Sequence, residues 1–127
     1  MNLGAIHHVA IIVSDVEKAK EFYVNKLGFE ILHDLYRPEQ DDHRLDVQLG
    51  TVRLEIFGKK HAPARVTNPE ALGLRHLAFA VENVEAAAAE LNALGIETEP
   101  IRIDPLSGRK CTFFRDPDDL PLELYGG

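Results

Sequence analysis

Cysteine, long apolar runs and basic residues are scarce in this sequence of 127 residues, and each scarcity excludes a structural feature or a class of partner. The single cysteine, Cys111, excludes an intrachain disulfide and fits a reducing compartment, so we expect a cytoplasmic protein. No apolar run approaches the ~20 residues of a membrane span, and the first residues lack a signal-peptide pattern. Basic residues number 14 against 21 acidic ones, for a net charge of −7, so we expect neither a nucleic-acid partner nor a membrane partner. With 45% hydrophobic residues, the composition is that of one globular domain.

An internal repeat runs through the sequence. The segment at 8–31 reads HVAIIVSDVEKAKEFYVNKLGFEI and aligns with HLAFAVENVEAAAAELNALGIET at 76–98, with one residue deleted in the second copy. The repeat continues to the end, where TVRLEIF at 51–57 aligns with DLPLELY at 119–125. The offset between the copies is too long for a solenoid of small repeats, so it predicts two copies of a compact module in one chain.

Each copy has the pattern of one strand, one helix and three further strands. Residues 6–13 and 75–81 are short apolar runs typical of strands. Helical stripes start at Val16 and Val84, after N-cap residues, and glycines at 28 and 95 are expected to end these helices. Strand-like segments then follow at 29–36, 44–49 and 51–57, and again at 97–103, 110–115 and 120–125. We therefore expect an α+β fold in a single domain over 1–127, with two tandem βαβββ modules at 1–60 and 74–127 and a linker at 61–73.

Four polar residues occupy equivalent strand positions in the two copies. His8 and His76 belong to the first strand of each copy, and Glu55 and Glu123 to the last. Because successive side chains of a strand point to opposite faces, each of the four lies opposite the bulky aliphatic residues of its strand. The aliphatic faces are expected to pack under the helices. If the two other faces curve toward each other, they form a cup that contains four potential metal ligands.

Two imidazoles and two carboxylates suit one divalent metal ion, which could be Ni, Zn, Co, Mn or Fe. Four protein ligands leave two positions open at an octahedral ion, and a small-molecule substrate with adjacent oxygens could fill them. The metal would act as a Lewis acid and stabilise an enediolate, while Glu123 or Glu55 would move a proton as the base. The alternative is that these residues are hydrogen-bonded structural residues or relics of a duplication.

The chain resembles the vicinal oxygen chelate superfamily, which includes glyoxalase I, bleomycin resistance proteins and extradiol dioxygenases. The resemblance covers nearly the whole chain through HHVAIIVSDVEKAKEFYVNKLGF at 7–29, VRLEIF at 52–57, LRHLAFAV at 74–81 and DPDDLPLELY at 116–125. The chain is most similar to a small bacterial lactoylglutathione-lyase-like subfamily. The resemblance implies a metal-binding cup of curved mixed sheets, with these ligands: His8, Glu55, His76 and Glu123.

Within the superfamily, the ligand set favours a metal-dependent lyase or isomerase of the glyoxalase I type. Methylmalonyl-CoA epimerases usually carry Gln at the position of Glu55, and fosfomycin-modifying members normally lack an equivalent. One position departs from glyoxalase I, which has an arginine that helps to hold glutathione where this chain has Ile12. The alternatives are a non-catalytic protein that sequesters a small molecule, or another enzyme of the superfamily such as an epimerase, a dioxygenase or a thiol transferase.

Basic residues near the expected cup are candidates for binding the polar tail of the substrate. Arg37 follows a strand-like run and Arg109 and Lys110 follow a turn, and Arg suits planar carboxylate or phosphate groups. Arg75 adjoins His76, but strand alternation predicts that it points to the other face. Exposed sheet edges make a homodimer the expected assembly, and the sequence leaves open whether one chain or two supply the four metal ligands.

Overall fold

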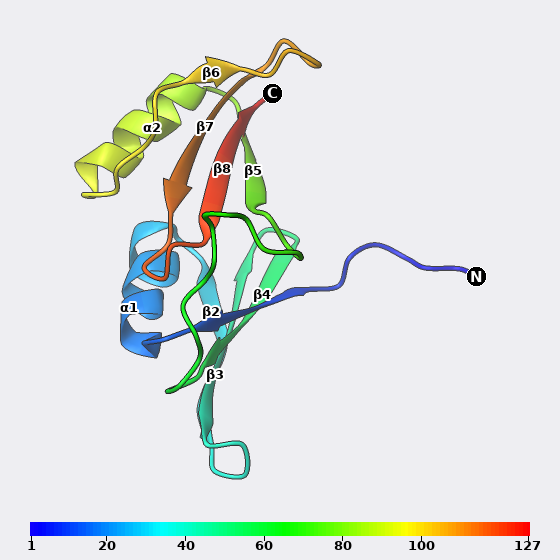
Figure 1. Ribbon diagram of the computed structural model, residues 1–127, viewed down its shortest axis with the longest axis vertical. Helices are drawn as coiled ribbons and strands as arrows, with labels where there is room; N and C mark the ends of the chain where they lie inside the picture. The colour runs from blue at the N-terminus through cyan, green and yellow to red at the C-terminus, as the bar shows by residue number, and fades with distance from the viewer. The chain divides into compact units, whose positions relative to one another are not determined.

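The computed structural model describes residues 1–127, which form two compact units (Figure 1). The first unit is Met1–Ala64 and the second is Arg65–Gly127. Each unit contains its own four-stranded sheet and its own helical segment. None of the helices is long and apolar enough to cross a membrane.

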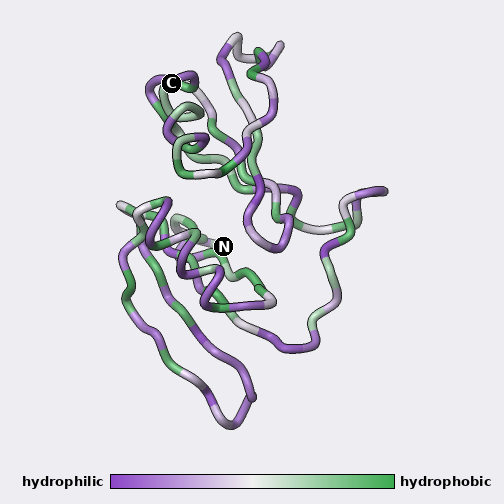
Figure 2. Tube along the Cα trace, turned by 90° about the vertical axis from the view of Figure 1, so that its left-hand side faces the viewer, coloured by the Kyte–Doolittle hydropathy of each residue, from purple (hydrophilic) through white to green (hydrophobic).

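The first unit follows the order strand, helix and three strands. It comprises β1 (Val9–Val13), α1 (Val16–Lys20) continued by a π-helical segment η1 (Glu21–Lys26), β2 (Glu30–Arg37), β3 (Asp42–Leu49) and β4 (Val52–Gly58). The strand order in the sheet is β1-β4-β3-β2, with β1 parallel to β4 and the other pairs antiparallel. In the long β2–β3 hairpin (Figure 2), β2 is mostly exposed along its whole length, whereas β3 buries Leu45 and Val47.

The second unit repeats this topology. It comprises β5 (Leu77–Val81), α2 (Val84–Ala93), β6 (Arg102–Ile103), β7 (Lys110–Arg115) and β8 (Pro121–Gly126). The strand order is β5-β8-β7-β6, and β5 is again parallel to the last strand. The α+β prediction of two βαβββ modules is therefore confirmed. The strand expected at 97–103 is reduced to β6, since Pro100 has no backbone N–H with which to continue the ladder.

Local signals at the helix ends act as the sequence predicts. The side chain of Asp15 accepts bonds from the backbone N–H groups of Glu17 and Lys18, and that of Asn83 accepts one from Ala86. After the helices, Gly28 and Gly95 have φ angles of +87° and +82°, a conformation that glycine adopts without steric cost. Each helix is thus held between a side-chain cap and a glycine.

The core of each unit lies between the helix and one face of the sheet. In the first unit, the aliphatic side chains of β3 and β4 pack with the aromatic residues of the helical segment and of the loop after it. These residues are fully or almost fully buried: Phe22, Tyr23, Phe29, Leu45, Val47, Leu54 and Ile56. In the second unit, α2 packs on β7 and β8 (Figure 1) and buries Val84, Ala88, Leu91, Phe114, Leu122 and Leu124. The opposite face of each sheet is left free for polar residues.

A close approach between the helix and the last strand recurs in both units. A Cβ atom added at Gly58 would lie 2.4 Å from Cγ2 of Val16, and one added at Gly126 would lie 3.2 Å from Cγ2 of Val84. Both contacts join the first residue of a helix to the glycine that ends the last strand. The repeat in the sequence therefore preserves a packing constraint as well as the order of the elements.

We expect Gly58→Ala to destabilise the protein, because the added methyl group collides with Val16. Overpacking of this kind costs about 1–3 kcal/mol of unfolding free energy. Denaturant unfolding checks the result. Gly4→Ala is the control, since its added Cβ meets nothing within 4 Å. If both variants unfolded at the wild-type midpoint, the proposed close packing would be wrong.

Candidate functional site

His8 and Glu55 meet on the open face of the first sheet. His8 immediately precedes β1, and Glu55 lies in the middle of β4. The parallel register sets Ala10 beside Glu55, and His8, at the entry to β1, lies close enough for its side chain to reach that of Glu55. The distance between His8 Nε2 and Glu55 Oε2 is 3.4 Å, and the Glu55 side chain is only 13% exposed.

The second unit builds the same pair from the same elements. His76 immediately precedes β5, and the parallel register sets Ala78 beside Glu123 of β8. His76 Nε2 lies 3.3 Å from Glu123 Oε1, and the Glu123 side chain is 11% exposed. The sequence predicted both histidines within the first strand of their unit, but the structure places each of them just before it. Each histidine still lies against the glutamate that was predicted to share its face.

The two pairs have donor atoms and spacing that fit a divalent metal ion. An ion bound about 2.0–2.2 Å from its ligands separates neighbouring donor atoms by about 3–3.5 Å, and both His–Glu distances lie in that range. The other ring nitrogen of His8, Nδ1, contacts Nδ1 of His7 at 2.9 Å. No group of three or more His, Cys, Asp or Glu side chains in the structure could hold a metal ion. Each pair therefore offers two donor atoms that fit a metal ion.

Glu55 is additionally held by a cation. Arg44 Nη2 lies 3.3 Å from Glu55 Oε2, and the same guanidinium donates to both oxygens of Asp46 at 2.9 and 3.1 Å. Asp46 is buried beside Glu55 in the ladder and also contacts His33 Nδ1 at 3.0 Å. Burial raises the pKa of Asp46, but the bonds from Arg44 and His33 outweigh it and keep the pKa below its ordinary value. Asp46 thus stays ionised and fixes Arg44 against Glu55.

Glu123 has different surroundings. The residue beside it in the ladder is Phe113, where the first unit has a carboxylate, and this ring packs edge-on against His76 with the ring centroids 5.1 Å apart. The buried thiol of Cys111 also lies against Glu123; burial raises the pKa of the thiol, and the carboxylate adds to the rise. The ion-pair partner of Glu123 is His76. Glu123 is therefore held without the arginine that restrains Glu55.

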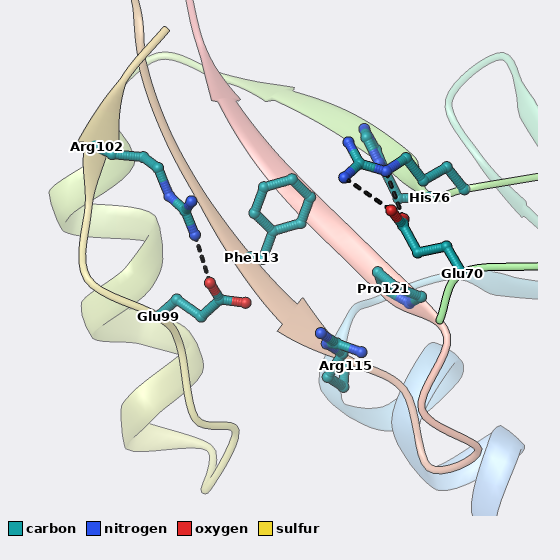
Figure 3. Close-up of a pocket in the computed structure, with 8 residues that line it drawn as sticks. Glu70, His76, Glu99, Arg102, Phe113, Arg115 and Pro121 are labelled. Atoms are coloured by element: carbon teal, nitrogen blue, oxygen red, sulfur yellow. Dashed lines mark hydrogen bonds and ion pairs between the residues drawn. The ribbon is translucent and has the colours of Figure 1, made fainter. Parts of the chain in front are cut away.

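A hollow of about 250 Å³ opens beside His76 within the second unit (Figure 3). Phe113 lies at its centre, with the Arg102–Glu99 ion pair on one side and His76 and Glu70 on the other. The remaining lining residues are Arg75, Arg115 and Pro121. The open face of the second sheet thus joins one His–Glu pair to a pocket rich in arginine.

The three substrate residues predicted from sequence do not line this pocket. Arg37 donates two 2.8 Å bonds to the buried Asp42 and lies over the ring of Phe57. This guanidinium, together with Lys59, holds the pKa of Asp42 well below its usual range. Lys110 pairs with Glu85 in the first turn of α2, on the helix-covered face of the sheet, and Arg109 lies in the preceding turn. Their roles toward a substrate stay predictions.

The pocket arginines are residues that the sequence reasoning missed. Arg75 was expected to point away from His76, and this was wrong, because both residues precede β5 and strand alternation does not apply to them. Arg102 and Arg115 were not considered. A usable signal existed for Arg115, since alternation in 110–115 places it on the same face as Phe113, the ladder neighbour of Glu123.

Comparison with known proteins identifies close relatives over the full chain. A family model described as the Glyoxalase/Bleomycin resistance protein/Dioxygenase superfamily matches residues 5–124. YwkD of Bacillus subtilis, described as uncharacterized, is 56% identical over 126 residues, which are 98% of each chain. The crystal structure of a glyoxalase family protein from Enterococcus faecalis is 58% identical with a TM-score of 0.92, covering 95% of this chain and 96% of that one.

Enzymes occur among the more distant relatives. Human mitochondrial methylmalonyl-CoA epimerase is 30% identical over 122 residues, which cover 93% of this chain and 69% of the epimerase. A lactoylglutathione lyase of Schizosaccharomyces pombe is 25% identical over 146 residues, which cover 98% of this chain and 48% of the lyase.

Proposed function

Because the chain belongs to the glyoxalase/bleomycin resistance protein/dioxygenase superfamily, we propose that it is a metal-dependent lyase or isomerase of the glyoxalase I type. The proposed reaction converts a hemithioacetal, the adduct of a thiol and a 2-oxoaldehyde, into the thioester of a 2-hydroxy acid. The observation that carries the proposal is the recurrence of one His–Glu pair, with the same register and nearly the same distance, in both units.

We propose that both pairs bind one divalent ion, Ni, Zn, Co, Mn or Fe, as the donor set His8, Glu55, His76 and Glu123 supplied by one chain or by two copies. Such an ion, when bound, supplies Lewis-acid chemistry, because it draws electron density from two adjacent substrate oxygens and eases loss of a proton from the neighbouring carbon. Mixed imidazole and carboxylate donors suit these ions.

Glu123 is the proposed base. The base must be able to change its contacts during turnover, and Glu55 is restrained by Arg44 at 3.3 Å, which is itself fixed by Asp46. Glu123 pairs with His76, contacts the thiol of Cys111 and lies next to the pocket side chain Phe113, so no arginine or lysine restrains it. In the proposed step, a Glu123 oxygen takes the proton from the carbon that bears sulfur and returns a proton to the adjacent carbon. One proton also moves between the two substrate oxygens, so the reaction needs no oxidant or reductant.

Epimerisation is the second candidate function. The 30% identity with human methylmalonyl-CoA epimerase over 93% of this chain favours it. Its chemistry is closely related, since a proton leaves a carbon next to a carbonyl group and returns to the same carbon on the opposite face. Against it stands Glu55, because epimerases of this superfamily usually carry Gln there. Proton return to the adjacent carbon or to the same carbon is the difference between the two reactions.

The thiol that forms the substrate adduct need not be glutathione. Glyoxalase I has an arginine that helps to hold glutathione at the position of Ile12, and Ile12 is 60% exposed. A different thiol is therefore expected to serve as well as glutathione or better.

Assays of both reactions test the proposal. The protein, loaded in turn with Ni, Co, Mn, Zn and Fe, is mixed with methylglyoxal and one of several thiols, and thioester formation is followed by absorbance. In parallel, methylmalonyl-CoA is incubated with the protein in heavy water, and deuterium uptake is followed by mass spectrometry. We expect thioester formation with at least one thiol. Deuterium uptake without thioester formation would favour epimerisation, and neither activity in a protein that also retains no metal would favour sequestration.

We also propose that the chain forms a homodimer. The edge strands β1 and β2 of the first sheet carry exposed apolar side chains, among them Ile12, Ile31 and Leu35. Pairing of such edges between copies protects them from uncontrolled association. Sedimentation velocity at micromolar concentration would detect the dimer, and a monomer under those conditions would contradict it.

A further inference from the structure

The pocket beside His76 gathers three arginines on an acidic protein. The whole chain carries a net charge of −7, yet Arg75, Arg102 and Arg115 all line this hollow. Each arginine has one carboxylate partner, which is Glu70, Glu99 or Asp119, respectively. Because the arginine charges are matched in this way, the pocket suits a monoanion such as a carboxylate better than a doubly charged phosphate ester, and the planar guanidinium fork matches a carboxylate.

The three pocket arginines differ in how fully they are used. Glu70 accepts two bonds from Arg75 at 2.6 and 3.3 Å, so that guanidinium is well occupied. Arg115 has weaker partners, the side chain and main-chain oxygens of Asp119 at 3.4 and 3.5 Å, which are at the outer limit of a hydrogen bond. Arg115 therefore keeps the most donor capacity for a ligand.

Arg102 is the second cation available to a ligand. Its Nη2 donates to Glu99 at 2.5 Å, and its guanidinium carbon lies 5.7 Å from the centroid of the Phe113 ring. An arginine anchored by one carboxylate and one ring is held in place while other N–H groups stay free. Arg102 and Arg115 lie on either side of Phe113 (Figure 3).

The volume of the pocket and the Phe113 ring that lines it limit which ligands can bind there. Its volume of about 250 Å³ is below the range of about 300–1,000 Å³ typical of sites for drug-sized ligands. Phe113 offers an apolar surface to a short carbon chain, and the same ring contacts His76. A fragment bound here would have its charged end at the arginines and its other end near the His76–Glu123 pair.

We propose that this pocket is a carboxylate subsite, which selects substrates that carry a short acidic arm beyond the reacting oxygens. Arg115 is its main contact and Arg102 its second, and both are specificity-determining residues. The assignment of the arm to a substrate rests on the proposed function, whereas binding of a carboxylate by the pocket does not.

Binding without turnover tests the subsite directly. The protein is titrated with 3-(methylthio)propionate, and amide NMR shifts are followed; the methyl ester of the same acid is the neutral probe. We expect the acid to shift the amide signals of Arg102, Phe113 and Arg115, and the ester to shift them much less. Because bonds to a charged group are lost, Arg115→Gln should weaken binding of the acid roughly 10- to 100-fold. Lys18→Gln removes one positive charge from an exposed position of α1 and should leave binding unchanged.

Kinetics test the role of the subsite in substrate choice. Methylglyoxal adducts of 3-mercaptopropionate and 2-mercaptoethanol differ in the charge of the arm, and we expect wild type to have the lower KM for the acidic adduct. Arg115→Gln and Arg102→Gln should raise that KM about tenfold or more, with little effect on kcat or on the neutral adduct. Lys18→Gln again serves as the control.

The outcomes separate the two proposals. Equal binding of acid and ester, or wild-type binding by Arg115→Gln, would overturn the subsite whether or not the protein turns over hemithioacetals. Selective binding of the acid, lost in Arg115→Gln, would support the subsite even if no thioester forms, and the failure would then belong to the proposed function.

Discussion

Glu123→Gln should lose hemithioacetal isomerisation by about 10²–10⁴-fold in kcat, the range that positioned acid–base groups contribute. Gln keeps the shape of the side chain and one oxygen that can still bind a metal, but it cannot accept a proton. The variant should therefore fold and retain metal while turnover is lost. Steady-state kinetics, metal content by mass spectrometry and thermal unfolding measure these three quantities in the same preparation.

Two matched variants make the Glu123 experiment decisive. Glu55→Gln makes the same chemical change in the other pair, and we expect a smaller loss, because Glu55 is restrained by Arg44 and acts as a ligand. Glu90→Gln removes an exposed carboxylate from α2 and should leave turnover unchanged. If Glu55→Gln lost turnover and Glu123→Gln kept it, the roles of the two glutamates would be reversed. Wild-type rates in both variants would show that neither glutamate transfers the proton.

Removal of the metal is expected to have the second large effect on turnover. Dialysis against a chelator should lower turnover by more than about 100-fold, and readdition of one of Ni, Co, Mn, Zn or Fe should restore it. The metal-free protein should also melt at a lower temperature, because a ligand present at 100 times its Kd stabilises the folded state by about 2.7 kcal/mol. A chelator-treated protein with full activity and an unchanged melting temperature would contradict the proposed metal.

Histidine variants locate the metal independently of activity. His8→Ala and His76→Ala each remove one donor from one His–Glu pair and should lower the metal content after purification. His61→Ala is the matched control, because His61 is exposed and takes part in neither pair. Loss of metal in only one of the two ligand variants would mean that one pair alone binds the ion, and equal metal content in all three would place the metal elsewhere.

Sequence reasoning predicted most of the fold because the relevant signals are local and occur twice. The alternation of aliphatic and polar residues in β1 and β4 placed Glu55 opposite the buried Leu54 and Ile56, as the structure confirms. The helix caps and the glycines after the helices depend on a few neighbouring residues, so they too were readable. The helix of the first unit was harder to predict. Its continuation η1 widens to a π-helical turn in which both Phe22 and Tyr23 are buried, and no local sequence pattern indicates this widening.

The basic residues expected to bind substrate were less predictable than the fold, because the availability of a cation depends on distant partners. Arg37 looked available in the sequence, but Asp42 across the β2–β3 turn takes up its guanidinium. Lys110 pairs with Glu85, which is 25 residues away in the chain. Whether a cation is free or neutralised depends on contacts made only after the strands and helices have packed.

By itself, the sequence determined the two-module α+β plan, the faces of the strands and the two His–Glu pairs as candidates for metal binding, because periodicity and an internal repeat encode these features along the chain. Only the tertiary structure decided which glutamate is restrained by Arg44 and which arginines gather beside His76. The physical reason is that strand register brings together side chains from separate strands and loops, and the pairing of charges around a pocket depends on all of them at once.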